Sequence, residues 1–503
     1  HVGFVARQNI ETREYTFITP TPETITNFSD FVEYDYDETR NRYTIDPGEH
    51  WFFRERPDRP LLPPQFRFNW SSPFIISSNN SNRVFFGSNY LFQSDDRGDN
   101  WKIISPDLTT NDKNLRNTSN GGGLTNSNTG GENHFTIITI SDTPIDKDII
   151  WIGTDDGNVQ ITKDNGDNWE NVRLNINDVP LKTWVSRVEA SKHKKGRAYV
   201  TFDNHRFDDN KPYVFMTDDY GKTWKNITSN LPIDYSVYVI KEDYIDENLL
   251  FVGTEKSVYF TINHGKSWEQ LGSNLPSVAV HDLVIHPRDG DLIAGTHGKS
   301  IWILDDISAL RNLNLKSSSI LPIKKSTKWI TINTGRKQPY FEFRGKNPPY
   351  GAIINFFGNR SEKGTLIISN DLESNFYSTE INISKGLNRF LWPFKLDRST
   401  EELVNYKRKF IDLVNDFSDI VLDKKNLKSY NFQKLNSFAE VNKLRKKFLD
   451  EFGMYANGKN IFGDKVYQTY DIQPGKYKVK IELESGESFT DIIIVRDDPI
   501  KSN

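Results

Sequence analysis

The 503-residue sequence predicts an all-β protein, with a multi-bladed β-propeller followed by a second, smaller β-domain. Two observations predict the propeller. The pattern Ser/Thr-x-Asp-x-Gly-x-x-Trp begins at Ser94 and returns three times, and its four tryptophans are 68, 55 and 44 residues apart. Runs of short apolar strands surround each copy. Repetition of one small β-unit, which cannot bury both of its faces alone, is typical of blades that stack around an axis.

The four copies of the pattern, called boxes below, are predicted to be turns between the third and fourth strands of a blade. Gly permits a positive φ there, Asp accepts backbone N–H groups, and Trp fills the adjacent core. Because the boxes recur at one position per blade, their residues are predicted to be structural and not catalytic. They are Ser94, Asp96, Gly98, Trp101, Thr162, Asp164, Gly166, Trp169, Thr217, Asp219, Gly221, Trp224, Thr261, Asn263, Gly265 and Trp268.

The N-terminal part, 1–65, is predicted to be a partial blade with a long insertion. In residues 1–19 two segments of alternating apolar and polar residues flank a turn, which predicts a β-hairpin. A hairpin alone is only marginally stable, so we expect it to complete a sheet whose first strands lie elsewhere. Residues 20–65 are acidic, then proline-rich, with many aromatic side chains, and predict an ordered arm that docks on a partner.

The propeller is predicted over 66–310, with five strand units, of which the fifth has no box. An irregular basic linker is expected over 311–345. A small immunoglobulin-like β-sandwich is expected over 346–398 and 461–497, since five or more short strands with turn residues occur there. Between these halves, 399–460 has apolar residues spaced by three and four, which predicts a helical insertion.

The composition limits the classes of partner and chemistry. With 64 basic and 68 acidic residues the net charge is −4, so nucleic acid is not expected as a partner. The sequence has no cysteine, which excludes thiol catalysis, disulfides and thiolate metal sites. No apolar run is long enough to cross a membrane, so no transmembrane segment is expected.

The start of the sequence, His1-Val2-Gly3-Phe4, has neither a methionine nor a signal-peptide pattern. The absence of cysteine is consistent with an exported bacterial protein that avoids mispairing. We therefore expect an exported chain, in the periplasm, at the cell surface or secreted, whose signal is not in this sequence.

The candidate binding residues lie at the starts of inner strands and in the loops near them. From several blades they could converge at the mouth of the central channel, although hydrogen bonding between blades is the alternative role. They are His134, Trp184, Arg187, His205, His281 and His297.

A glycosidase needs two carboxyl groups at a defined separation, about 5 Å or about 6.5 to 9.5 Å. The candidates for such a pair are Glu132, Asp155 and Asp282. A sialidase also needs an arginine cluster for its substrate carboxylate, and Arg187 is the main inner-strand arginine, so sialidase activity is not expected. Whether the chain is an enzyme stays open at this point.

No cofactor is expected and no metal ligands are assigned. The one segment with calcium-type ligands is the polar loop with Asp203-Asn204-His205-Arg206 and Asp208-Asp209. An ordinary turn loop explains the same residues, so a structural Ca²⁺ is the weaker interpretation.

The boxes resemble the Asp-box, or bacterial neuraminidase repeat. The chain is similar to Asp-box propellers of sialidases, xyloglucan-degrading endoglucanases and sortilin-type receptors, and above all to large exported bacterial proteins labelled glycosyl hydrolase or sortilin-like. The phrases that carry this resemblance are Phe68-Asn69-Trp70-Ser71-Ser72-Pro73, Trp151-Ile152-Gly153-Thr154-Asp155-Asp156-Gly157, Phe251-Val252-Gly253-Thr254-Glu255, His281-Asp282-Leu283-Val284-Ile285-His286-Pro287-Arg288 and Gly295-Thr296-His297-Gly298. The resemblance implies the fold more strongly than the function.

The function predicted from these observations is recognition. A propeller face, extended by the aromatic arm and the helical insertion, would bind protein or polysaccharide partners, either alone or as part of a surface complex. The alternative is an endoglucanase-like glycoside hydrolase that acts on a β-glucan-type polysaccharide with two of the three candidate carboxylates.

Overall fold

A computed structural model describes residues 5–31, 36–37, 42–43, 66–116, 134–272, 275–311, 313, 317–329, 349–369, 376–397, 407–408, 410–411, 430–431, 434–435, 440–441, 443–444, 447–448, 455–456, 459–460 and 469–498. This part of the chain is almost entirely β, which confirms the predicted all-β class. It forms two compact units, His1–Arg311 and Asn312–Asn503. The short helical segments are α1 (Lys113–Arg116), η1 (Phe28–Asp30), η4 (Arg173–Asn175), η5 (His205–Phe207) and η6 (Ser308–Leu310).

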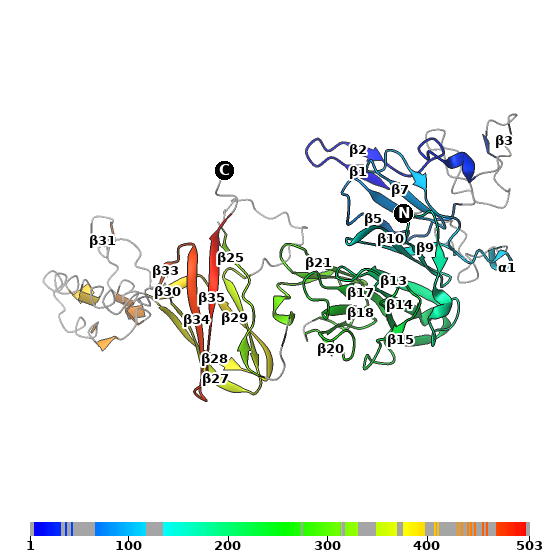
Figure 1. Ribbon diagram of the computed structural model, residues 1–503. Helices are drawn as coiled ribbons and strands as arrows, with labels where there is room; N and C mark the ends of the chain where they lie inside the picture. The colour runs from blue at the N-terminus through cyan, green and yellow to red at the C-terminus, as the bar shows by residue number, and fades with distance from the viewer. Residues whose placement is uncertain are drawn as a thin grey trace. The chain divides into compact units, whose positions relative to one another are not determined.

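Five antiparallel sheets of three or four strands in the first unit, here called blades A to E, follow one another in chain order (Figure 1). Blade A comprises β5 (Phe74–Ile76), β6 (Val84–Gly87), β7 (Leu91–Ser94) and β8 (Lys102–Ile103), and blade B comprises β9 (Ile137–Thr143), β10 (Asp146–Thr154), β11 (Val159–Thr162) and β12 (Glu170–Asn171). Blade C comprises β13 (Trp184–Ala190), β14 (Ala198–Asn204), β15 (Asp209–Thr217) and β16 (Lys225–Asn226). Blade D comprises β17 (Val237–Glu242), β18 (Leu250–Thr254), β19 (Val258–Thr261) and β20 (Glu269–Gln270), and blade E comprises β21 (Val280–Ile285), β22 (Leu292–Thr296) and β23 (Ile301–Leu304).

The first strands of neighbouring blades, β9, β13, β17 and β21, lie next to one another in that order. A separate apolar cluster fills each interface between blades. Between blades B and C, for example, Trp151 and Val159 pack against Val188 and Phe202. Blades in register around their inner strands, each covered by the next, are the arrangement of a β-propeller, so that prediction is confirmed as well.

Each box forms the turn between the third and fourth strands of its blade. In blade B the Thr162 hydroxyl donates to Asp164 at 2.8 Å, and it accepts the Gly166 N–H at 2.9 Å. Asp164 also accepts the N–H of Asn168 at 2.8 Å. Gly166 has φ +102°, so the turn requires a residue without a Cβ.

The boxes also join consecutive blades. Each box glycine packs on the residue that follows the last strand of the preceding blade, as in the pairs Gly166 with Ile104, Gly221 with Val172 and Gly265 with Ile227. In addition, the indole N–H of Trp169 donates to the Ile104 carbonyl at 3.0 Å. Trp268 makes the same bond to the Ile227 carbonyl at 2.8 Å, whereas Trp224 donates to Gly221 within its own turn.

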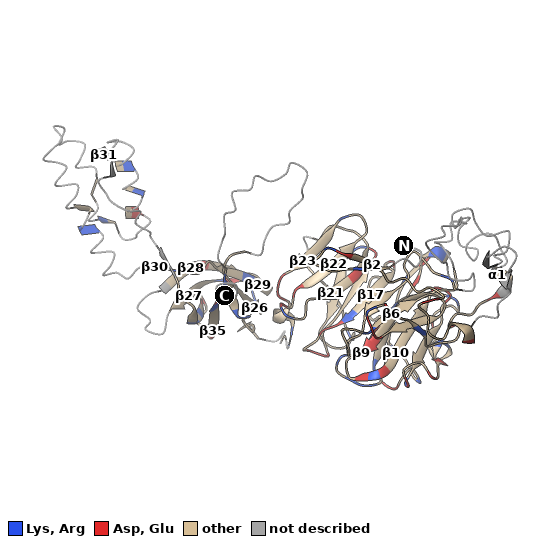
Figure 2. Cartoon of the chain, turned by 90° about the horizontal axis from the view of Figure 1, so that it is seen from above, with Lys and Arg blue, Asp and Glu red and all other residues tan. Residues whose placement is uncertain are grey.

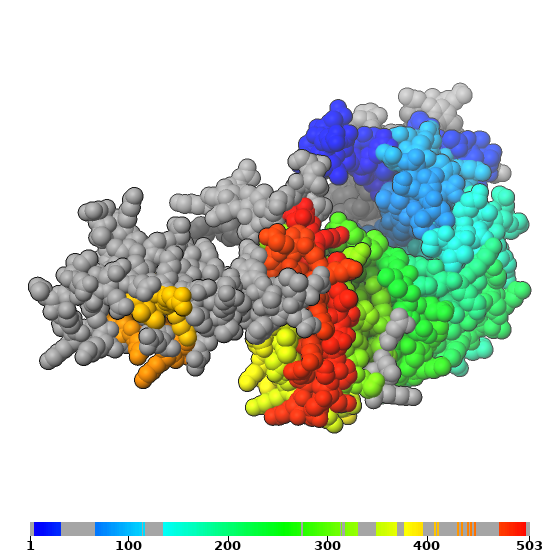
Figure 3. All heavy atoms as spheres, turned by 60° about the vertical axis from the view of Figure 1, so that its left-hand side comes forward, coloured from blue at the N-terminus to red at the C-terminus, as the bar shows by residue number. Residues whose placement is uncertain are grey.

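The N-terminal hairpin takes the place of the outer two strands of a further blade. Strands β1 (Ala6–Gln8) and β2 (Tyr15–Phe17) form an antiparallel pair, called the half-blade below. Ile18, the first residue after β2, packs on Gly98 of the box in blade A, and its carbonyl accepts the indole N–H of Trp101 at 2.9 Å. These are the contacts that Ile104 and Ile227 make with the boxes of the following blades. Figure 3 shows the dark blue half-blade beside the light blue blade A.

Part of the region predicted as an arm, 20–65, covers blade A. Ile25 and Phe28 are buried with Phe66, Phe68 and Trp101 in one cluster. A small pair of strands, β3 (Tyr36–Asp37) and β4 (Arg42–Tyr43), follows. The rest of the predicted arm lies outside the described residues, as does most of the predicted helical insertion, 399–460.

The second unit contains two larger sheets that share one core. A three-stranded sheet has the order β24 (Ser319–Ile320), β26 (Ala352–Gly358), β29 (Gly386–Trp392). A five-stranded sheet has the order β25 (Ser326–Lys328), β35 (Ser488–Asp497), β34 (Gly475–Leu483), β27 (Glu362–Ser369), β28 (Phe376–Ile383). Two further pairs are β30 (Lys395–Asp397) with β33 (Thr469–Asp471) and β31 (Tyr455–Ala456) with β32 (Lys459–Asn460).

The core of the second unit contains Phe356 from the first sheet and Val479 from the second. The sequence predicts a linker over 311–345, but β24 and β25 lie inside that range and form edges of the two sheets. Strands of two and three residues are too short to show an alternating pattern, which is why the linker prediction missed them.

Candidate functional site

A β-bulge interrupts the beginning of the inner strand in four consecutive blades. In blade D, Val237 pairs with Thr254 and Val239 pairs with Gly253, so Tyr238 is an extra residue. The corresponding extra residues are Ile138 in blade B, Ser186 in blade C and His281 in blade E. A bulge leaves its extra residue out of the ladder and redirects its side chain, and bulges concentrate next to functional sites.

The bulged residues of blades D and E stack on each other. The rings of Tyr238 and His281 are 4.2 Å apart and nearly parallel, with an interplanar angle of 15°. His297, which follows β22, lies 5.4 Å from His281, and His205 meets the edge of Tyr238 at 6.2 Å. We call Tyr238, His205, His281 and His297 the ring cluster. It joins three blades, and all three of its histidines are exposed, whereas Tyr238 is buried.

Carboxylates and an arginine surround the ring cluster. The Tyr238 hydroxyl donates to Glu255, which follows β18. Buried Asp203, at the end of β14, contacts Nδ1 of His205 at 2.7 Å and accepts from Arg206 at 3.1 Å. The Arg206 guanidinium lies 4.0 Å from the ring centroid of Trp184, the first residue of β13. The cluster is therefore extended by a cation–π pair on blade C.

The surroundings shift the pKa values of Tyr238, His281 and the adjacent Asp203. Burial raises the pKa of the Tyr238 hydroxyl, and the hydrogen bond to Glu255 raises it further. Partial burial lowers the pKa of His281, and the neighbouring His297 lowers it further. Burial alone would raise the pKa of Asp203, but His205 and Arg206 outweigh it, and the pKa lies below its usual value. At neutral pH the stacked pair Tyr238 and His281 is consequently uncharged.

Arg187, on the inner strand of blade C, contacts the ring cluster at His281. Its guanidinium donates to Asp282 at 2.9 Å and to the carbonyl of His281 at 3.3 Å. Asp282 also accepts the N–H of Leu283 at 3.0 Å. The pair thus ties the inner strand of blade C to the inner strand of blade E at the position of the bulge.

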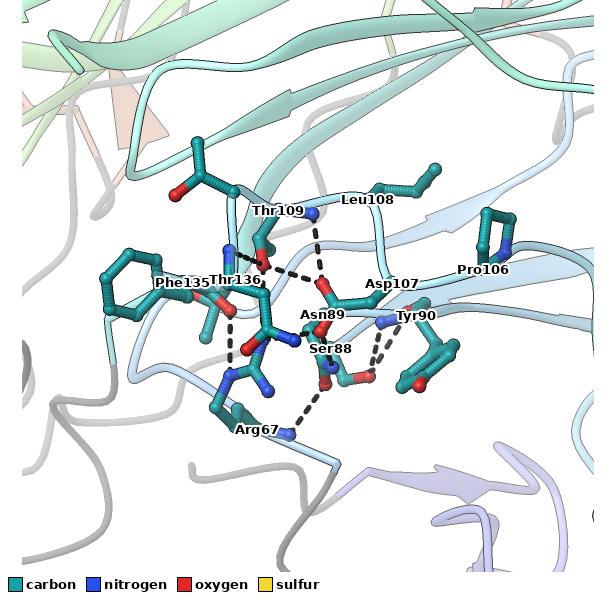
Figure 4. Close-up of polar contacts among 12 residues, drawn as sticks. Arg67, Ser88, Asn89, Tyr90, Pro106, Asp107, Leu108, Thr109, Phe135 and Thr136 are labelled. Atoms are coloured by element: carbon teal, nitrogen blue, oxygen red, sulfur yellow. Dashed lines mark hydrogen bonds and ion pairs between the residues drawn. The ribbon is translucent and has the colours of Figure 1, made fainter. Parts of the chain in front are cut away.

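In blades A and B, hydrogen bonds among polar residues connect the end of the blades that corresponds to the ring cluster of blades C, D and E (Figure 4). Arg67 donates to Asp107 at 2.8 Å, to Thr109 at 3.2 Å and to the carbonyl of Phe135 at 3.1 Å. Asn89 also donates to Asp107 at 2.8 Å. Burial would raise the pKa of Asp107, but the charge of Arg67 outweighs it and the pKa is lowered. This network is buried or half-buried, so it serves the packing of blades A and B.

Asp155 and His134 lie at this end of blades A and B. Asp155 is 2% exposed and accepts the N–H and the hydroxyl of Thr136 at 2.8 and 2.6 Å. Nε2 of His134 lies 3.3 Å from the carbonyl oxygen of Asp155, and its ring packs on Phe135 at 4.5 Å. Burial raises the pKa of Asp155 well above its usual value, and the neighbouring Asp156 adds to the effect.

Replacement of Asp155 by asparagine is expected to stabilise the protein at neutral pH. Since the pKa of Asp155 is higher in the folded state than in the unfolded state, the folded protein binds more protons, and its stability falls as pH rises above the unfolded-state pKa. Asparagine keeps both contacts to Thr136 without a charge. We expect Tm to rise by about 2 to 4 °C at pH 7 and the difference to vanish near pH 4, where both side chains are neutral.

The matched control is Asp203→Asn, because Asp203 is also buried but has a lowered pKa. It is expected to lower Tm at pH 7. Thermal unfolding of the three proteins at both pH values measures the effect. If Asp155→Asn lowered Tm at pH 7, the hydrogen bonds of the carboxylate would outweigh the cost of burying its charge.

The structure brings five of the six candidate binding residues together: Trp184, Arg187, His205, His281 and His297 lie in or beside the ring cluster. His134 lies apart, on buried Asp155. Of the candidate catalytic residues, Asp282 is paired with Arg187 and Asp155 is buried, while Glu132 lies outside the described residues. Sequence reasoning missed Tyr238, Asp203 and Arg206 as members of the site.

A repeated phrase could have located part of the site. Gly-Thr ends the second strand in blades B, D and E, and the next residue is Asp155, Glu255 or His297. The polar loop considered for Ca²⁺ is held by its own hydrogen bonds, among them those of Asp203 with His205 and of Asp209 with Asn204. Across the described residues, no group of three or more His, Asp or Glu is arranged to hold a metal ion. Nor does this part of the chain contain a helix with the length and apolar character needed to cross a membrane.

Comparison with known proteins finds one matching family model and a number of similar solved structures. The model of the Sortilin-Vps10 family, described as sortilin, neurotensin receptor 3, matches residues 212–395. No curated protein matches the sequence.

Among solved structures, the GH74 xyloglucanase from Xanthomonas campestris is 16% identical, with 49% of this chain and 40% of that chain covered and a TM-score of 0.36. The GH74 enzyme of Niastella koreensis is 16% identical, with coverage of 62% and 50% and a TM-score of 0.33. YCF48 bound to D1 peptide is 13% identical, with coverage of 65% and 95% and a TM-score of 0.32. The chain thus spans half or less of the length of these two GH74 enzymes.

Proposed function

We propose that the chain is a binding module whose ligand surface is the ring cluster and its surroundings on blades C, D and E. The observation that carries this proposal is the alignment of bulges in adjacent blades, which stacks Tyr238 on His281 and places two further imidazoles beside them. Aromatic and imidazole rings provide a large contact area that loses little conformational entropy on binding, and they are enriched at binding surfaces. The partner is a protein or a polysaccharide.

The contacts of the candidate carboxylates favour binding over glycoside hydrolysis. A hydrolytic pair needs one carboxyl that gives or takes a proton at the scissile bond and a second that faces it. Asp282 is engaged by Arg187 and Asp155 by Thr136, so neither presents a free carboxylate. In Figure 2 the acidic and basic residues are distributed together along the described blades, which supports a partner other than nucleic acid.

The test uses the chain itself against two defined sets of probes, a glycan array and a displayed library of random peptides. Any ligand found is then measured against Tyr238→Ala and His281→Ala. Removal of a central ring typically costs more than 1 kcal/mol at a binding surface, so each variant is expected to weaken binding about tenfold.

The chain offers matched controls at the opposite ends of the same two strands. Tyr244 lies two residues after the end of β17, and His286 follows the end of β21. Tyr244→Ala and His286→Ala are expected to leave affinity unchanged. A ligand whose affinity is the same for all four variants binds elsewhere and contradicts the proposed surface.

Finer features of the sequence prediction belong to this proposal as well. The boxes are Asp-boxes, the second unit is an immunoglobulin-like sandwich with a helical insertion, and the protein is exported. The receptor name of the family that matches 212–395 and the absence of cysteine support export. Labelling of intact cells with a membrane-impermeant biotin reagent tests it, since a protein kept in the cytosol would remain unlabelled.

A further inference from the structure

In blade B a carboxylate binds both donors of the residue that precedes the inner strand. The Asp155 carboxylate accepts the N–H of Thr136 at 2.8 Å and its hydroxyl at 2.6 Å. The N–H of Asp155 in turn donates to the carbonyl of Thr136 at 3.1 Å. Both residues are buried, so these bonds leave no donor of Thr136 unpaired at the start of β9.

Blade D has the same backbone arrangement but a different carboxylate contact. Glu255 follows β18 as Asp155 follows β10. Ser236 precedes β17 as Thr136 precedes β9, and its carbonyl accepts the N–H of Glu255 at 3.0 Å. The Glu255 carboxylate, however, accepts the hydroxyl of Tyr238 and not the donors of Ser236.

The contact with Tyr238 leaves both donors of Ser236 unpaired. Ser236 is 1% exposed, and neither its hydroxyl nor its N–H donates to an acceptor among the described residues. A buried donor without an acceptor destabilises the state that contains it. If Glu255 took the place that Asp155 has in blade B, Ser236 would be satisfied, but the hydroxyl of buried Tyr238 would lose its acceptor. Either position of the carboxylate therefore leaves one buried residue unpaired.

We propose that the Glu255 carboxylate has two positions, and that a ligand at the ring cluster selects the position on Ser236 by replacing Glu255 at the Tyr238 hydroxyl. The inference rests on the proposed function, because it assigns the ligand group that meets Tyr238. That group is an acceptor oxygen of a carbonyl, carboxylate or hydroxyl, since the Tyr238 hydroxyl donates.

The energetic basis is that only the ligand-bound state pairs every group. With Glu255 on Ser236 and a ligand oxygen on Tyr238, all three donors have acceptors, whereas each ligand-free position leaves one residue unpaired. A ligand shifts such an equilibrium by its difference in affinity for the two positions. The Glu255 side chain is exposed, so it can change rotamer without disturbing the core.

Tyr238→Phe tests the second position without any ligand, because it removes the hydroxyl that holds Glu255. A crystal structure of this variant is expected to show the Glu255 carboxylate within hydrogen-bond distance of the N–H and hydroxyl of Ser236. Hydrogen exchange over residues 233–238, read by mass spectrometry, is expected to slow about tenfold at Ser236 relative to wild type.

Two controls accompany the exchange measurement. Glu255→Ala added to Tyr238→Phe removes the acceptor and is expected to abolish the protection. Asp155→Ala is expected to speed exchange at Thr136, which shows that the measurement responds to a carboxylate at this position. Circular dichroism establishes that each variant is folded.

The coupling to binding is tested with the peptide or glycan of highest affinity from the library and the array. Its addition to wild type is expected to slow exchange over 233–238 by a similar factor. Ser236→Ala is expected to weaken its binding about tenfold, although the Ser236 hydroxyl contacts no polar group in the ligand-free structure. His286→Ala, at the opposite end of blade E, is the control and is expected to change neither affinity nor exchange.

The outcomes separate this inference from the proposed function. If Glu255 in Tyr238→Phe points to solvent, with Ser236 unpaired or bonded to water, the two positions are overturned. A ligand that binds without changing exchange over 233–238 overturns the coupling and leaves the proposed function intact. If neither probe set yields a ligand while Glu255 bonds to Ser236 in the crystal, the proposed function fails and the two positions of Glu255 stand.

Discussion

Replacement of Gly166 by alanine is expected to lower the free energy of unfolding of the first unit by about 2 to 5 kcal/mol. Two effects add. The backbone at Gly166 has φ +102°, which a residue with a Cβ adopts only with strain. A Cβ at this position would also lie 2.3 Å from the carbonyl oxygen of Ile104, so the box of blade B would have to move away from blade A. Urea unfolding followed by tryptophan fluorescence measures the change.

Gly298→Ala separates these effects. Gly298 has φ +81°, but a Cβ added to this residue would have no heavy atom within 4 Å. Backbone strain is then the only cost, about 1 to 2 kcal/mol. If Gly166→Ala cost no more than Gly298→Ala, the contact between the box and the preceding blade would not contribute to stability.

Replacement of Asp243 by alanine is expected to cost about 3 to 5 kcal/mol, because it leaves a largely buried arginine without its counter-ion. Both carboxylate oxygens of Asp243 accept from Arg311 at 2.8 Å. Asp243 also accepts the N–H groups of Ile245 and Asp246, each at 3.0 Å. The alanine variant loses these bonds together, while the guanidinium keeps its charge.

The exposed pair of Asp95 and Arg83 is the control. Arg83 donates to both carboxylate oxygens of Asp95, at 2.6 and 3.3 Å, but Asp95 lies largely in solvent. Asp95→Ala is expected to cost at most about 1 kcal/mol. Similar losses for Asp243→Ala and Asp95→Ala would show that burial of the first pair does not determine its contribution.

The repeat made the propeller predictable from sequence. Each box is local, since its hydroxyl, its glycine and the oxygen of its Asp or Asn contact one another within five residues, and the hydroxyl donates to that oxygen in all four copies. The hairpin within residues 1–19 was also predicted, whereas the contact of Ile18 with the box of blade A was not.

The ring cluster was only partly predictable. His281, Trp184 and Arg187 were placed at the starts of inner strands, where the structure has them. Tyr238 could not be identified from sequence because only the β-bulge distinguishes it from its neighbours. A bulge depends on the register between two strands, which the sequence of one strand does not specify. His134 was grouped with the other candidates because of its position before an inner strand. In the structure it contacts buried Asp155 in blade B and lies apart from the ring cluster.

The link between each box and the preceding blade has a consequence for the order of folding during synthesis. Ile18, Ile104, Val172 and Ile227 each precede the box glycine that they contact. When a blade leaves the ribosome, the residue that its turn must dock on is therefore already present in the blade before it. Domains form progressively from the N-terminus during translation, and in a stack with nearest-neighbour contacts each new blade can add to a finished edge. The boxes thus allow assembly in one direction, with no blade waiting for a later one to close its turn.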